Sequence, residues 1–490
     1  FNPEPKPGLR RMNFRKICEN GFGDGNNAYP YSSAWFKGHY YVGTSRANLC
    51  LLKFAMPFVK IDQWPVECLH RNFTPEFEWK HARGEIWRYN PDTEEWQRMY
   101  QSPMVEGDDG TVYSRDLGYR SMVVFQGESD PEPALYVATW SRSRSDGPEI
   151  LRCVDGVTFE ATPKLQFESQ TIEVTVNSIR VLIPYKGKLY TAPTGSGKGY
   201  VNIAWLSLIY ESRDPAKGIW RSVNDPGFDE PPEVGCVYDM EVMGDYLYAG
   251  TGGLNGFQVW RTLAEGPPPY QWEKIIDKGA GRGGLNQGIV SMRAFNGALY
   301  VGTGIQNGGY DHRFQVGPAA AEVIRFHPDN SWDIVVGNPR DGKRPISRLT
   351  AGFGNYFCGY IWRMGIHDGW LYVGTMDWSV ILRFTNLPAK PKRISHILAK
   401  AGIDEFLENY GACELWRTCD GENWLPVTRT GFDNPYNYGI RSIVSTPYGL
   451  FIGTANPFGP RVAVRTSEDW EWAYEDNPDG GLEIWQGIGL

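Results

Sequence analysis

The five residues Leu371-Tyr-Val-Gly-Thr375 decide the fold, because versions of them recur along the 490-residue chain. A short extended run and a two-residue turn such as Asp368-Gly369 precede most copies, and Gly supplies the positive φ that tight hairpins require. Each copy therefore predicts the second strand of an antiparallel hairpin. The other six copies are Tyr40-Tyr-Val-Gly-Thr44, Leu135-Tyr-Val-Ala-Thr139, Leu189-Tyr-Thr-Ala-Pro193, Leu247-Tyr-Ala-Gly-Thr251, Leu299-Tyr-Val-Gly-Thr303 and Leu450-Phe-Ile-Gly-Thr454.

A second phrase, Glu414-Leu-Trp-Arg417 and its relatives, follows the first, and its alternation predicts a third, half-buried strand. A fourth strand follows in most repeats after turns such as Asp420-Gly-Glu-Asn423. Seven units of about 70 residues predict an all-β fold, a seven-bladed β-propeller with four-stranded antiparallel blades. The other copies of the second phrase are Glu85-Ile-Trp-Arg88, Glu149-Ile-Leu-Arg152, Gly218-Ile-Trp-Arg221, Gln258-Val-Trp-Arg261, Glu322-Val-Ile-Arg325 and Glu483-Ile-Trp-Gln486.

The two ends of the chain are expected to meet in one blade. The last repeat stops after its third strand at Gln486, so we expect the N-terminal segment around Phe14 to Glu19 to supply the outer strand and close the ring. The sequence thus predicts a single β-propeller domain over residues 1–490, in which segment 1–28 partly closes the last blade. Two β-sandwiches or a non-propeller solenoid are the alternatives, and both explain seven matched copies less well.

Composition excludes several classes of protein. The chain is 41% hydrophobic and 22% charged, with 57 Gly and 34 Pro, which is typical of a turn-rich globular protein and not of a disordered chain. It has no run of about 18 apolar residues, so we expect no membrane span. Its net charge of −8 argues against nucleic acid as a partner and leaves a small-molecule substrate as the expectation, with the oligomeric state open.

The irregular sequence is expected to gather on one face of the propeller. Turns between first and second strands are almost all two residues long, whereas the second-to-third loops and the blade connections are long. The longest loops cover residues 45 to 83, 376 to 412 and 455 to 480. Because elaborated loops on a rigid scaffold commonly carry function, we expect the site at the mouth of the channel on that face.

Arginines recur on the expected innermost strands. Arg120, Arg180, Arg293, Arg363 and Arg441 fall there, together with Asp239 and Glu241. Five guanidinium groups near one axis favour an anionic ligand or a developing negative charge. The alternative is a purely structural role, in which these arginines pair with Asp239 and Glu241 between blades.

Metal ligands are sparse in this sequence. Cys68, His70 and His81 share one long loop, and Asp311-His312 lies on another, so calcium or zinc stays an alternative to the expectation of no cofactor. The eight cysteines include no C-x-x-C pair, and their even number does not by itself imply disulfides.

Several loop phrases carry a resemblance to a known family. They are Arg83-Gly-Glu-Ile-Trp-Arg-Tyr-Asn-Pro91, Gly118-Tyr-Arg-Ser-Met-Val-Val-Phe125, Leu371-Tyr-Val-Gly-Thr-Met-Asp-Trp378, and Asn434-Pro-Tyr-Asn-Tyr-Gly439 with Thr454-Ala-Asn-Pro457. Through them the chain resembles bacterial, largely cyanobacterial, propellers similar to the propeller portion of the cylindrocyclophane-forming Friedel-Crafts alkylating enzyme of natural product biosynthesis. That enzyme joins alkyl chlorides to resorcinol carbons and also carries a calcium-binding domain, for which this sequence contains no G-G-x-G-x-D repeat.

The resemblance implies specific roles for loop residues. Arg83 and Tyr438 or Tyr436 would hydrogen-bond a departing chloride, and Asp377 would take the phenol proton. The competing interpretation makes the Tyr436 to Tyr438 phrase a simple turn and Asp377 a strand-end cap. The resemblance favours a cytoplasmic location, and a secreted one stays open if a leader has been removed.

Three functions are compatible with these features. The first is an enzyme that alkylates or cyclises a phenolic or isoprenoid-like molecule, a transferase or cyclase whose apolar substrate chain lies against aromatic residues of the rim. The second is a polysaccharide lyase acting on uronates, and the third is a binding propeller without chemistry. A deep apolar pocket favours the first, an open basic groove the second and a flat rim the third. The rim aromatics are Trp35, Trp140, Trp378, Tyr356 and Phe357, and the arginines expected to bind substrate are Arg120, Arg363 and Arg441.

Overall fold

A computed structural model describes residues 6–55, 61, 63–141, 147–163, 177–194, 207–230, 235–305, 319–384, 402–466 and 471–489. The described chain is all-β, as the sequence predicts, with many antiparallel strands and few, short helices. Within these residues no helix is long and apolar enough to cross a membrane.

The strands form groups of four that pair antiparallel, and each group is called a unit and named after its first strand. The units are β2 (Asn27–Phe36), β3 (His39–Arg46), β4 (Glu85–Asn90) and β5 (Glu95–Gln101); β8 (Asp116–Phe125), β9 (Ala134–Ser141), β10 (Ile150–Cys153) and β11 (Glu160–Ala161); β12 (Ser178–Tyr185), β13 (Lys188–Thr194), β14 (Tyr210–Asp214) and β15 (Ile219–Ser222); β16 (Val237–Met243), β17 (Tyr246–Thr251), β18 (Val259–Thr262) and β19 (Glu273–Ile276); β20 (Gly288–Phe295), β21 (Ala298–Gly304), β22 (Val323–Phe326) and β23 (Trp332–Val336); β24 (Cys358–His367), β25 (Trp370–Asp377), β26 (Leu415–Thr418) and β27 (Leu425–Thr428); and β28 (Gly439–Thr446), β29 (Gly449–Ala455), β32 (Glu483–Gly487) and β1 (Phe14–Cys18).

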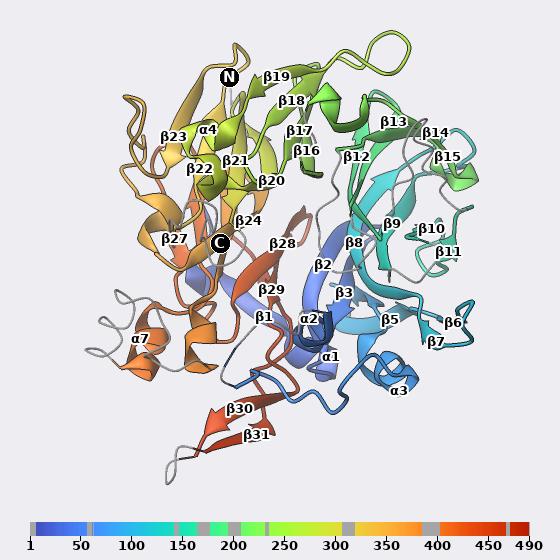
Figure 1. Ribbon diagram of the computed structural model, residues 1–490, viewed down its shortest axis with the longest axis vertical. Helices are drawn as coiled ribbons and strands as arrows, with labels where there is room; N and C mark the ends of the chain where they lie inside the picture. Colours follow the sequence, from blue (N-terminus) through green and yellow to red (C-terminus); the bar gives the residue numbers. More distant parts are fainter. Residues whose placement is uncertain are drawn as a thin grey trace.

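The outer strand of the β28 unit comes from the other end of the chain. β1 pairs antiparallel with β32, with Phe14 opposite Gly487 and Lys16 opposite Trp485. The first strands of successive units pack side by side in chain order, and β28 packs against β2. Figure 1 shows these strands around the middle of the molecule, with the later strands of each unit toward its edge.

The two recurring phrases are coupled by one hydrogen bond. In the β24 unit the backbone N–H of Glu414 donates to Thr375 Oγ1 at 2.9 Å, and in the β2 unit that of Glu85 donates to Thr44 Oγ1 at 3.1 Å. The glycine before the threonine lets the next unit approach, because a Cβ on Gly374 would lie 2.5 Å from Ile440 of β28. The two phrases therefore recur because the threonine joins the second strand to the third, and the glycine lets neighbouring units pack closely.

A turn before several first strands supplies a second recurring contact. In the β28 unit, Gly431 and Phe432 both have positive φ, and the Phe432 ring stacks on Trp485 with centroids 4.6 Å apart. Asn437 Nδ2 then donates to Gly431 O at 2.9 Å and to Glu483 Oε2 at 2.6 Å. We call this bridge the Asn–Glu clamp. It recurs as Asn27 with Glu85 and as Asn286 with Glu322.

Most short helices lie in turns, whereas the longer insertions gather on one side. The turn elements are η1 (Arg11–Asn13), α1 (Asn20–Gly23), η3 (Pro215–Lys217), η4 (Pro226–Asp229), α4 (Lys278–Gly281), η5 (Gly283–Asn286) and η6 (Ala351–Gly354). The insertions are α2 (Asn48–Ala55), α3 (Pro75–Phe77), η2 (Glu78–Ala82), β6 (Met104–Glu106), β7 (Val112–Ser114), η7 (Ser379–Phe384), α7 (Ile403–Tyr410), β30 (Arg461–Arg465) and β31 (Trp472–Asp476). Figure 1 shows the insertions in the lower half of the view.

Several insertions pack on one another in a second apolar core. Leu51, Phe77, Phe384, Phe458 and Val462 come from three different loops and belong to one buried cluster. We call α2, η2, η7, β30 and β31 with the connecting residues 63–68 the loop lobe. Because its parts come from units at both ends of the chain, the lobe also ties those units together.

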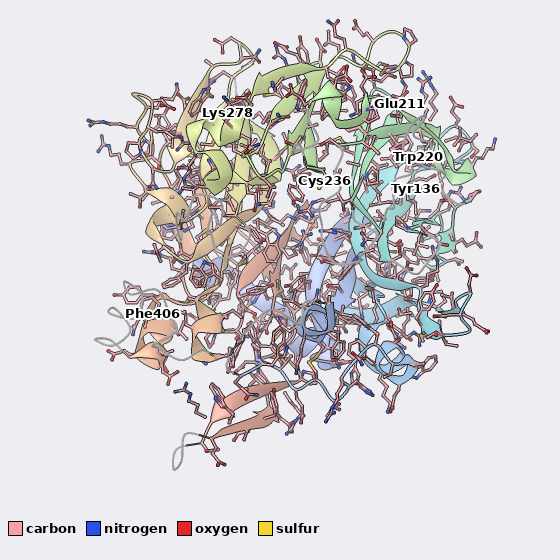
Figure 2. All side chains as sticks on the ribbon, in the orientation of Figure 1. Tyr136, Glu211, Trp220, Cys236, Lys278 and Phe406 are labelled. Atoms are coloured by element: carbon pink, nitrogen blue, oxygen red, sulfur yellow. A yellow bond between two sulfur atoms is a disulfide. The ribbon has the colours of Figure 1, made fainter. Side chains whose placement is uncertain are left out.

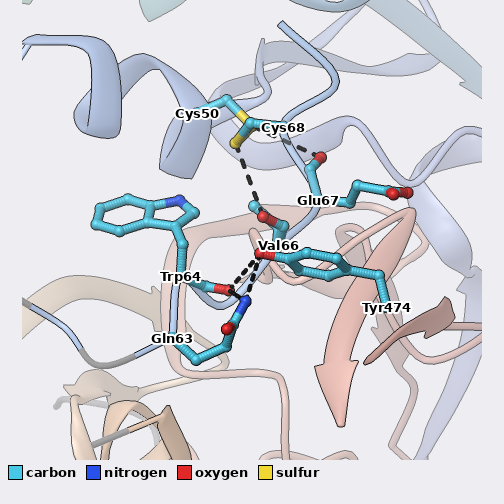
Figure 3. The surroundings of a disulfide bond; sticks show 7 residues. All are labelled: Cys50, Gln63, Trp64, Val66, Glu67, Cys68 and Tyr474. Carbon is cyan, nitrogen blue, oxygen red and sulfur yellow. Dashed lines mark hydrogen bonds between the residues drawn. A yellow bond between two sulfur atoms is a disulfide. The ribbon is translucent and has the colours of Figure 1, made fainter. Parts of the chain in front are cut away.

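A disulfide joins Cys50 of α2 to Cys68 in this lobe, and the two cysteines are 18 positions apart in the sequence. Figure 3 shows Tyr474 of β31 beside it, and the Tyr474 hydroxyl donates to the Trp64 carbonyl at 3.1 Å. The other six cysteines form no disulfide, and all of them except Cys419 are buried. The pair lies in a loop without periodicity, so no sequence pattern indicated it.

Candidate functional site

A cavity of about 350 Å³ lies among the first strands of the units. The three arginines predicted to bind substrate, Arg120, Arg363 and Arg441, all line it, and so do Arg180 and Arg293. Asp239 and Glu241 line it as well. Five guanidinium groups therefore face two carboxyl groups in one enclosure, which we call the arginine cavity.

One end of the arginine cavity is closed by a layer of bulged residues. Each first strand has a register shift near its start that leaves one residue without a partner, and such bulges turn a side chain out of the regular alternation. These residues are Tyr31, Arg120, Arg180, Tyr238, Val290, Trp362 and Arg441, and we call them the bulge layer.

The opposite end of the cavity is the more exposed one. Arg120 and Arg441 in the bulge layer are 3% and 2% exposed, whereas Pro184, near the hairpin end of β12, is exposed. The cavity thus opens toward the short hairpin turns. Above the bulge layer, the Trp140 ring packs against Tyr31 at 5.9 Å and belongs to the same apolar cluster as the loop lobe. The loop-rich face, where we expected the mouth, is filled at the axis by aromatic rings.

Neutral oxygens of neighbouring strands hold three of the guanidinium groups. Arg120 Nη1 donates to Ser178 Oγ at 3.0 Å, Arg180 Nε to Tyr238 O at 3.0 Å, and Arg363 Nε to Arg441 O at 3.1 Å. These three bonds orient the side chains, and none of the three acceptors is a carboxylate. The structural alternative, pairing with carboxylates between units, is found for Arg293, whose Nη1 lies 3.4 Å from Glu241 Oε2.

The two carboxyl groups are engaged mainly by backbone donors. Asp239 accepts from the N–H groups of Met240 at 3.0 Å and Met292 at 2.9 Å, and Glu241 accepts from Val242 at 2.8 Å. Burial raises the pKa of both carboxyls, which weakens their negative charge further. The cavity therefore carries an excess of positive charge.

Arg441 has the least compensated charge in the cavity. Its Nε and Nη1 atoms are buried and have no hydrogen-bond partner in the part of the chain that the structure describes. Its guanidinium lies over the rings of Tyr31 at 5.0 Å and Trp362 at 5.4 Å. Burial, with Arg363 as the nearest repelling charge, lowers the pKa of Arg441 well below its usual value. A buried donor of this kind is a ready partner for an anion.

The residues implied by the resemblance are placed in two groups. Asp377 is fully buried at the end of β25, where it accepts from Asn355 Nδ2 at 2.6 Å and from the Ser379 N–H at 2.7 Å. Its backbone N–H donates to Tyr438 O at 2.7 Å, so Asp377 and Tyr438 are neighbours. Burial raises the pKa of Asp377 to about 6. The pKa of this carboxyl is thus close to neutral pH, but the Asn355 amide covers the group.

The tyrosines and Arg83 have other partners. The Tyr438 hydroxyl is hydrogen-bonded to that of Tyr29, and burial raises its pKa. Tyr436 accepts from Arg383 Nη1 at 3.4 Å. Arg83 donates from Nε to Ser102 O at 2.7 Å, and its guanidinium stacks on Trp79 at 4.4 Å. No described contact of Arg83 is shared with Asp377 or Tyr438.

The predicted rim aromatics also divide. Phe357 packs on Trp378 with centroids 4.9 Å apart and on Tyr356 at 5.4 Å, so these three form one cluster. Trp35 instead lies at the hairpin end of β2, where its ring contacts Tyr448 at 5.5 Å. Its expected position on the loop-rich rim is wrong, because the alternation of β2 carries it past the bulge to the opposite face.

Sequence reasoning missed Glu414 as a site residue. Tyr356 and Phe357 line a second cavity, of about 310 Å³, and the Glu414 side chain faces it together with Arg429. The signal that could have found it is Cys358, which stands where three other units have the clamp asparagine.

The alternative metal site loses one of its ligands. Cys68 is bonded to Cys50, so its thiolate is not available to calcium or zinc beside His70 and His81. Across the described residues no group of three or more His, Cys, Asp or Glu side chains could hold a metal ion. Asp311 and His312 lie outside the described residues.

Of the comparisons with known proteins, only the one with solved structures finds matches. No family model matches the chain, and no curated protein matches it. Similar solved structures include a GH74 xyloglucanase from Xanthomonas campestris, 13% identical with a TM-score of 0.43, which covers 96% of this chain. The chain spans 56% of that xyloglucanase.

Two further structures are propeller proteins of similar size. YCF48 from Cyanidioschyzon merolae is 9% identical with a TM-score of 0.43, and 91% of this chain covers 97% of it. The β-propeller domain of the Trilobed protease from Pyrococcus furiosus is 9% identical with a TM-score of 0.38 and the same coverage. At these identities the likeness concerns the fold alone.

Proposed function

We propose that the protein binds a small organic anion in the arginine cavity. The observation that carries the proposal is Arg441, whose buried guanidinium has two nitrogen atoms without a hydrogen-bond partner among the described residues. Arg120, Arg180 and Arg363 line the same enclosure, and each donates a hydrogen bond to a neutral oxygen, so their positive charge adds to that of Arg441. A carboxylate or phosphate accepts such forked donors in two parallel hydrogen bonds.

The size of the cavity limits the ligand. A volume of about 350 Å³ is at the lower end of the range for small-molecule sites. The ligand therefore carries one or two anionic groups on a compact frame. A long polysaccharide does not fit this enclosure, which disfavours the uronate lyase except for a single terminal sugar.

Calorimetric titration tests the proposal. The probes are sulfate, inorganic phosphate, benzoate and glucuronate, each added to the wild type and to Arg441→Met at low ionic strength. We expect at least one probe to bind the wild type and to bind Arg441→Met at least tenfold more weakly. Arg344→Gln is the matched control, because Arg344 is exposed and outside the cavity. Equal affinity of all three proteins for every probe would refute the proposal.

The alkylating or cyclising activity is a second, finer candidate. The observation that favours it is the position of Tyr438, whose pKa responds to the nearby charge of Arg441. A phenol and a guanidinium together can donate hydrogen bonds to a departing halide. The backbone N–H of Asp377 donates to Tyr438 O, so the carboxyl-bearing residue is a direct neighbour. Release of chloride from an alkyl chloride in the presence of resorcinol measures this activity. Release that is unchanged in Tyr438→Phe and Asp377→Asn would contradict these roles.

We further propose that the units form one closed seven-bladed ring over residues 1–490. The pairing of β1 with β32 and the packing of β28 against β2 support this proposal. Deleting residues 1–19 removes β1 but keeps Asn27 and β2, and it should expose the edge of β32, which lowers stability and favours self-association. A shortened chain as stable and monomeric as the full one would contradict the closure.

A further inference from the structure

Glu414 departs from the electrostatic pattern of its counterparts in other units. Glu483 is bound by Asn434 and Asn437 and lies 3.4 Å from Lys16. Three counterparts, Glu483, Glu85 and Glu322, thus each have at least one amide and one cationic group, whereas Glu149 is paired with Arg115 at 2.6 Å. The partners of Glu85 are Asn27, Arg46, Trp87, Arg98 and Gln101, and those of Glu322 are Asn286, Arg282, Arg340 and the Asn338 N–H.

The clamp asparagine is replaced by a cysteine in the β24 unit. The Cys358 Cβ lies 2.8 Å from the Cβ position that Gly352 lacks, and Asn286 has the same relation to Gly279. The Cys358 thiol donates to Tyr360 O at 3.4 Å and not to Glu414. The carboxyl therefore lacks the amide that its counterparts receive, although the stacked ring of the turn, Phe353 on Trp416, is retained at 4.8 Å.

A second substitution places an acid where two other units, those of β2 and β28, have a base or an amide. Asp377 follows Thr375 by two residues, as Arg46 follows Thr44 and Asn456 follows Thr454. Arg46 lies 3.4 Å from Glu85, whereas Asp377 repels Glu414. Among the described residues, Glu414 is left with Trp416 Nε1 at 2.7 Å and Arg429 Nε at 3.3 Å.

These departures occur where the unit opens into a cavity of about 310 Å³. Its walls are Tyr356 and Phe357 before β24 and Phe406 and Tyr410 on α7, with Glu414 and Arg429 at its polar side. Figure 2 shows Phe406 on α7, at the lower left of the molecule and away from the first strands. Asn355 and Asn409 also line the cavity, so four aromatic rings form most of its wall and the polar side chains include one carboxyl group.

We propose that this cavity, the Glu414 pocket, binds a neutral aromatic molecule whose ring carries an N–H or O–H group, and that Glu414 accepts that hydrogen. The rings supply stacking and edge contacts for a flat ligand. A carboxyl oxygen that its own unit leaves unclamped supplies the specific polar contact. Arg429 balances the charge of Glu414, which disfavours a cationic or anionic ligand over a neutral one.

The surroundings of Glu414 also set its protonation. Burial raises its pKa to about 7, Asp377 of β25 adds to the rise, and Arg429 after β27 opposes it. The thiols of Cys358 and Cys413, the other titratable groups that face it, stay protonated because burial raises their pKa well above the usual value. A donor ligand therefore binds better to the ionised carboxyl, so affinity rises between pH 6 and pH 8.

Calorimetry with four matched small molecules tests the proposal on the full chain. Indole and phenol carry a donor, toluene has the ring alone, and benzoate is an anion. We expect indole and phenol to bind at least tenfold more tightly than toluene, and benzoate to bind no better than toluene at this pocket. Benzoate binding that disappears in Arg441→Met belongs to the arginine cavity, so the two sites are distinguishable. Equal binding of toluene and indole overturns the role of the carboxyl.

Three variants locate the binding. Cys358→Asn supplies the missing clamp amide and should weaken indole binding at least fivefold while preserving stability. Phe406→Leu removes a ring from the partly exposed α7 and should weaken all aromatic probes; Leu425→Ala on neighbouring β27 is the control, because Leu425 is 48% exposed and outside the pocket. If Cys358→Asn does not fold, Phe406→Leu still decides. Unchanged indole affinity in Phe406→Leu overturns the proposed location.

Discussion

Replacement of Arg441 by methionine separates the effect of the buried charge on stability from its effect on anion binding. Methionine keeps much of the length of the side chain and its contact with Tyr31 and Trp362 but removes the guanidinium. Breaking an ordinary buried ion pair costs about 3–5 kcal/mol, because it leaves an uncompensated charge. Arg441 has no such pair among the described residues, and its donors Nε and Nη1 are unmet. The usual penalty should therefore be absent.

The opposing contributions are of similar size. Two cation–π contacts stabilise the folded state by about 1–2 kcal/mol together. Two unmet donors, with the repulsion from Arg363 and the other cavity arginines, cost about 1–3 kcal/mol. The free energy of unfolding of Arg441→Met in the absence of ligand should thus lie within about 1 kcal/mol of the wild type, on the stabilised side.

Binding should respond in the opposite direction. A charge-assisted hydrogen bond contributes about 1.5–3 kcal/mol, so loss of Arg441 should lower the affinity for an anion by about 10- to 100-fold. Urea unfolding with and without the best-binding anion measures both effects in one experiment. A loss of more than about 3 kcal/mol without ligand, at unchanged slope, would refute the reasoning, because it would mean that Arg441 is a structural partner.

Three further predictions concern stability. Asp116 is fully buried, and burial raises its pKa to about 7. The folded state therefore binds more protons than the unfolded state from about pH 4 to pH 7, and stability falls as the pH rises through this range. Asp116→Asn should stabilise the protein at pH 8 and not at pH 4, as measured by urea unfolding. Reduction of the Cys50–Cys68 disulfide should cost about 3 kcal/mol for a loop of this length, and a Cys50→Ser, Cys68→Ser variant that is insensitive to reductant is the control. Asn437→Ala leaves Glu483 and the Gly431 carbonyl without their amide and should cost about 3 kcal/mol or more, whereas a shift of the urea midpoint worth less than 1 kcal/mol would contradict the importance of the clamp.

Most strands were predictable because the recurring residues make the same local contact in six of the seven units. Thr375 and Glu414 illustrate this, since a hydroxyl at the end of one strand and an N–H at the start of the next must meet in any antiparallel pair of this length. The convergence of Arg120, Arg363 and Arg441 was predictable for the same reason, because they occupy equivalent strands. In the β12 unit the prediction of the third strand was wrong, because Gly218-Ile-Trp-Arg221 forms the fourth strand β15 and the third is β14.

The direction of the arginine side chains was not predictable. It depends on a β-bulge in each first strand, and a bulge shows in the register and not in the alternation of residue types. Arg441, for example, lies between Ile440 and Ser442, whose partners Thr454 and Gly453 are consecutive. A plain alternation of residue types places the Arg441 charge correctly near the axis, but it does not tell how far along the axis the guanidinium lies.

The enclosure of Asp377 was beyond the sequence for another reason. Its position at the end of β25 is plain from the repeat, but the amide of Asn355 that covers it comes from the turn before β24. Loop contacts between distant segments carry no periodicity, so the chain alone does not tell a solvent-facing carboxyl from a covered one. The same holds for Arg83, whose carbonyl partner Ser102 belongs to the blade connection.

The repeated architecture itself makes departures informative. Where a unit clamps its glutamate with an amide and a cation, as at Glu483, the carboxyl is satisfied inside the fold and has nothing left for a ligand. Glu414 has lost the amide to Cys358 and gained Asp377 as a neighbour, and both changes raise the energy of the folded state without improving its packing. The arginine cavity departs in the same sense, because two buried donors of Arg441 have no acceptor among the described residues. Glu414 and Arg441 both lower the stability of the fold, and each lies at a cavity. A bound ligand of complementary chemistry would offset that loss of stability in each cavity.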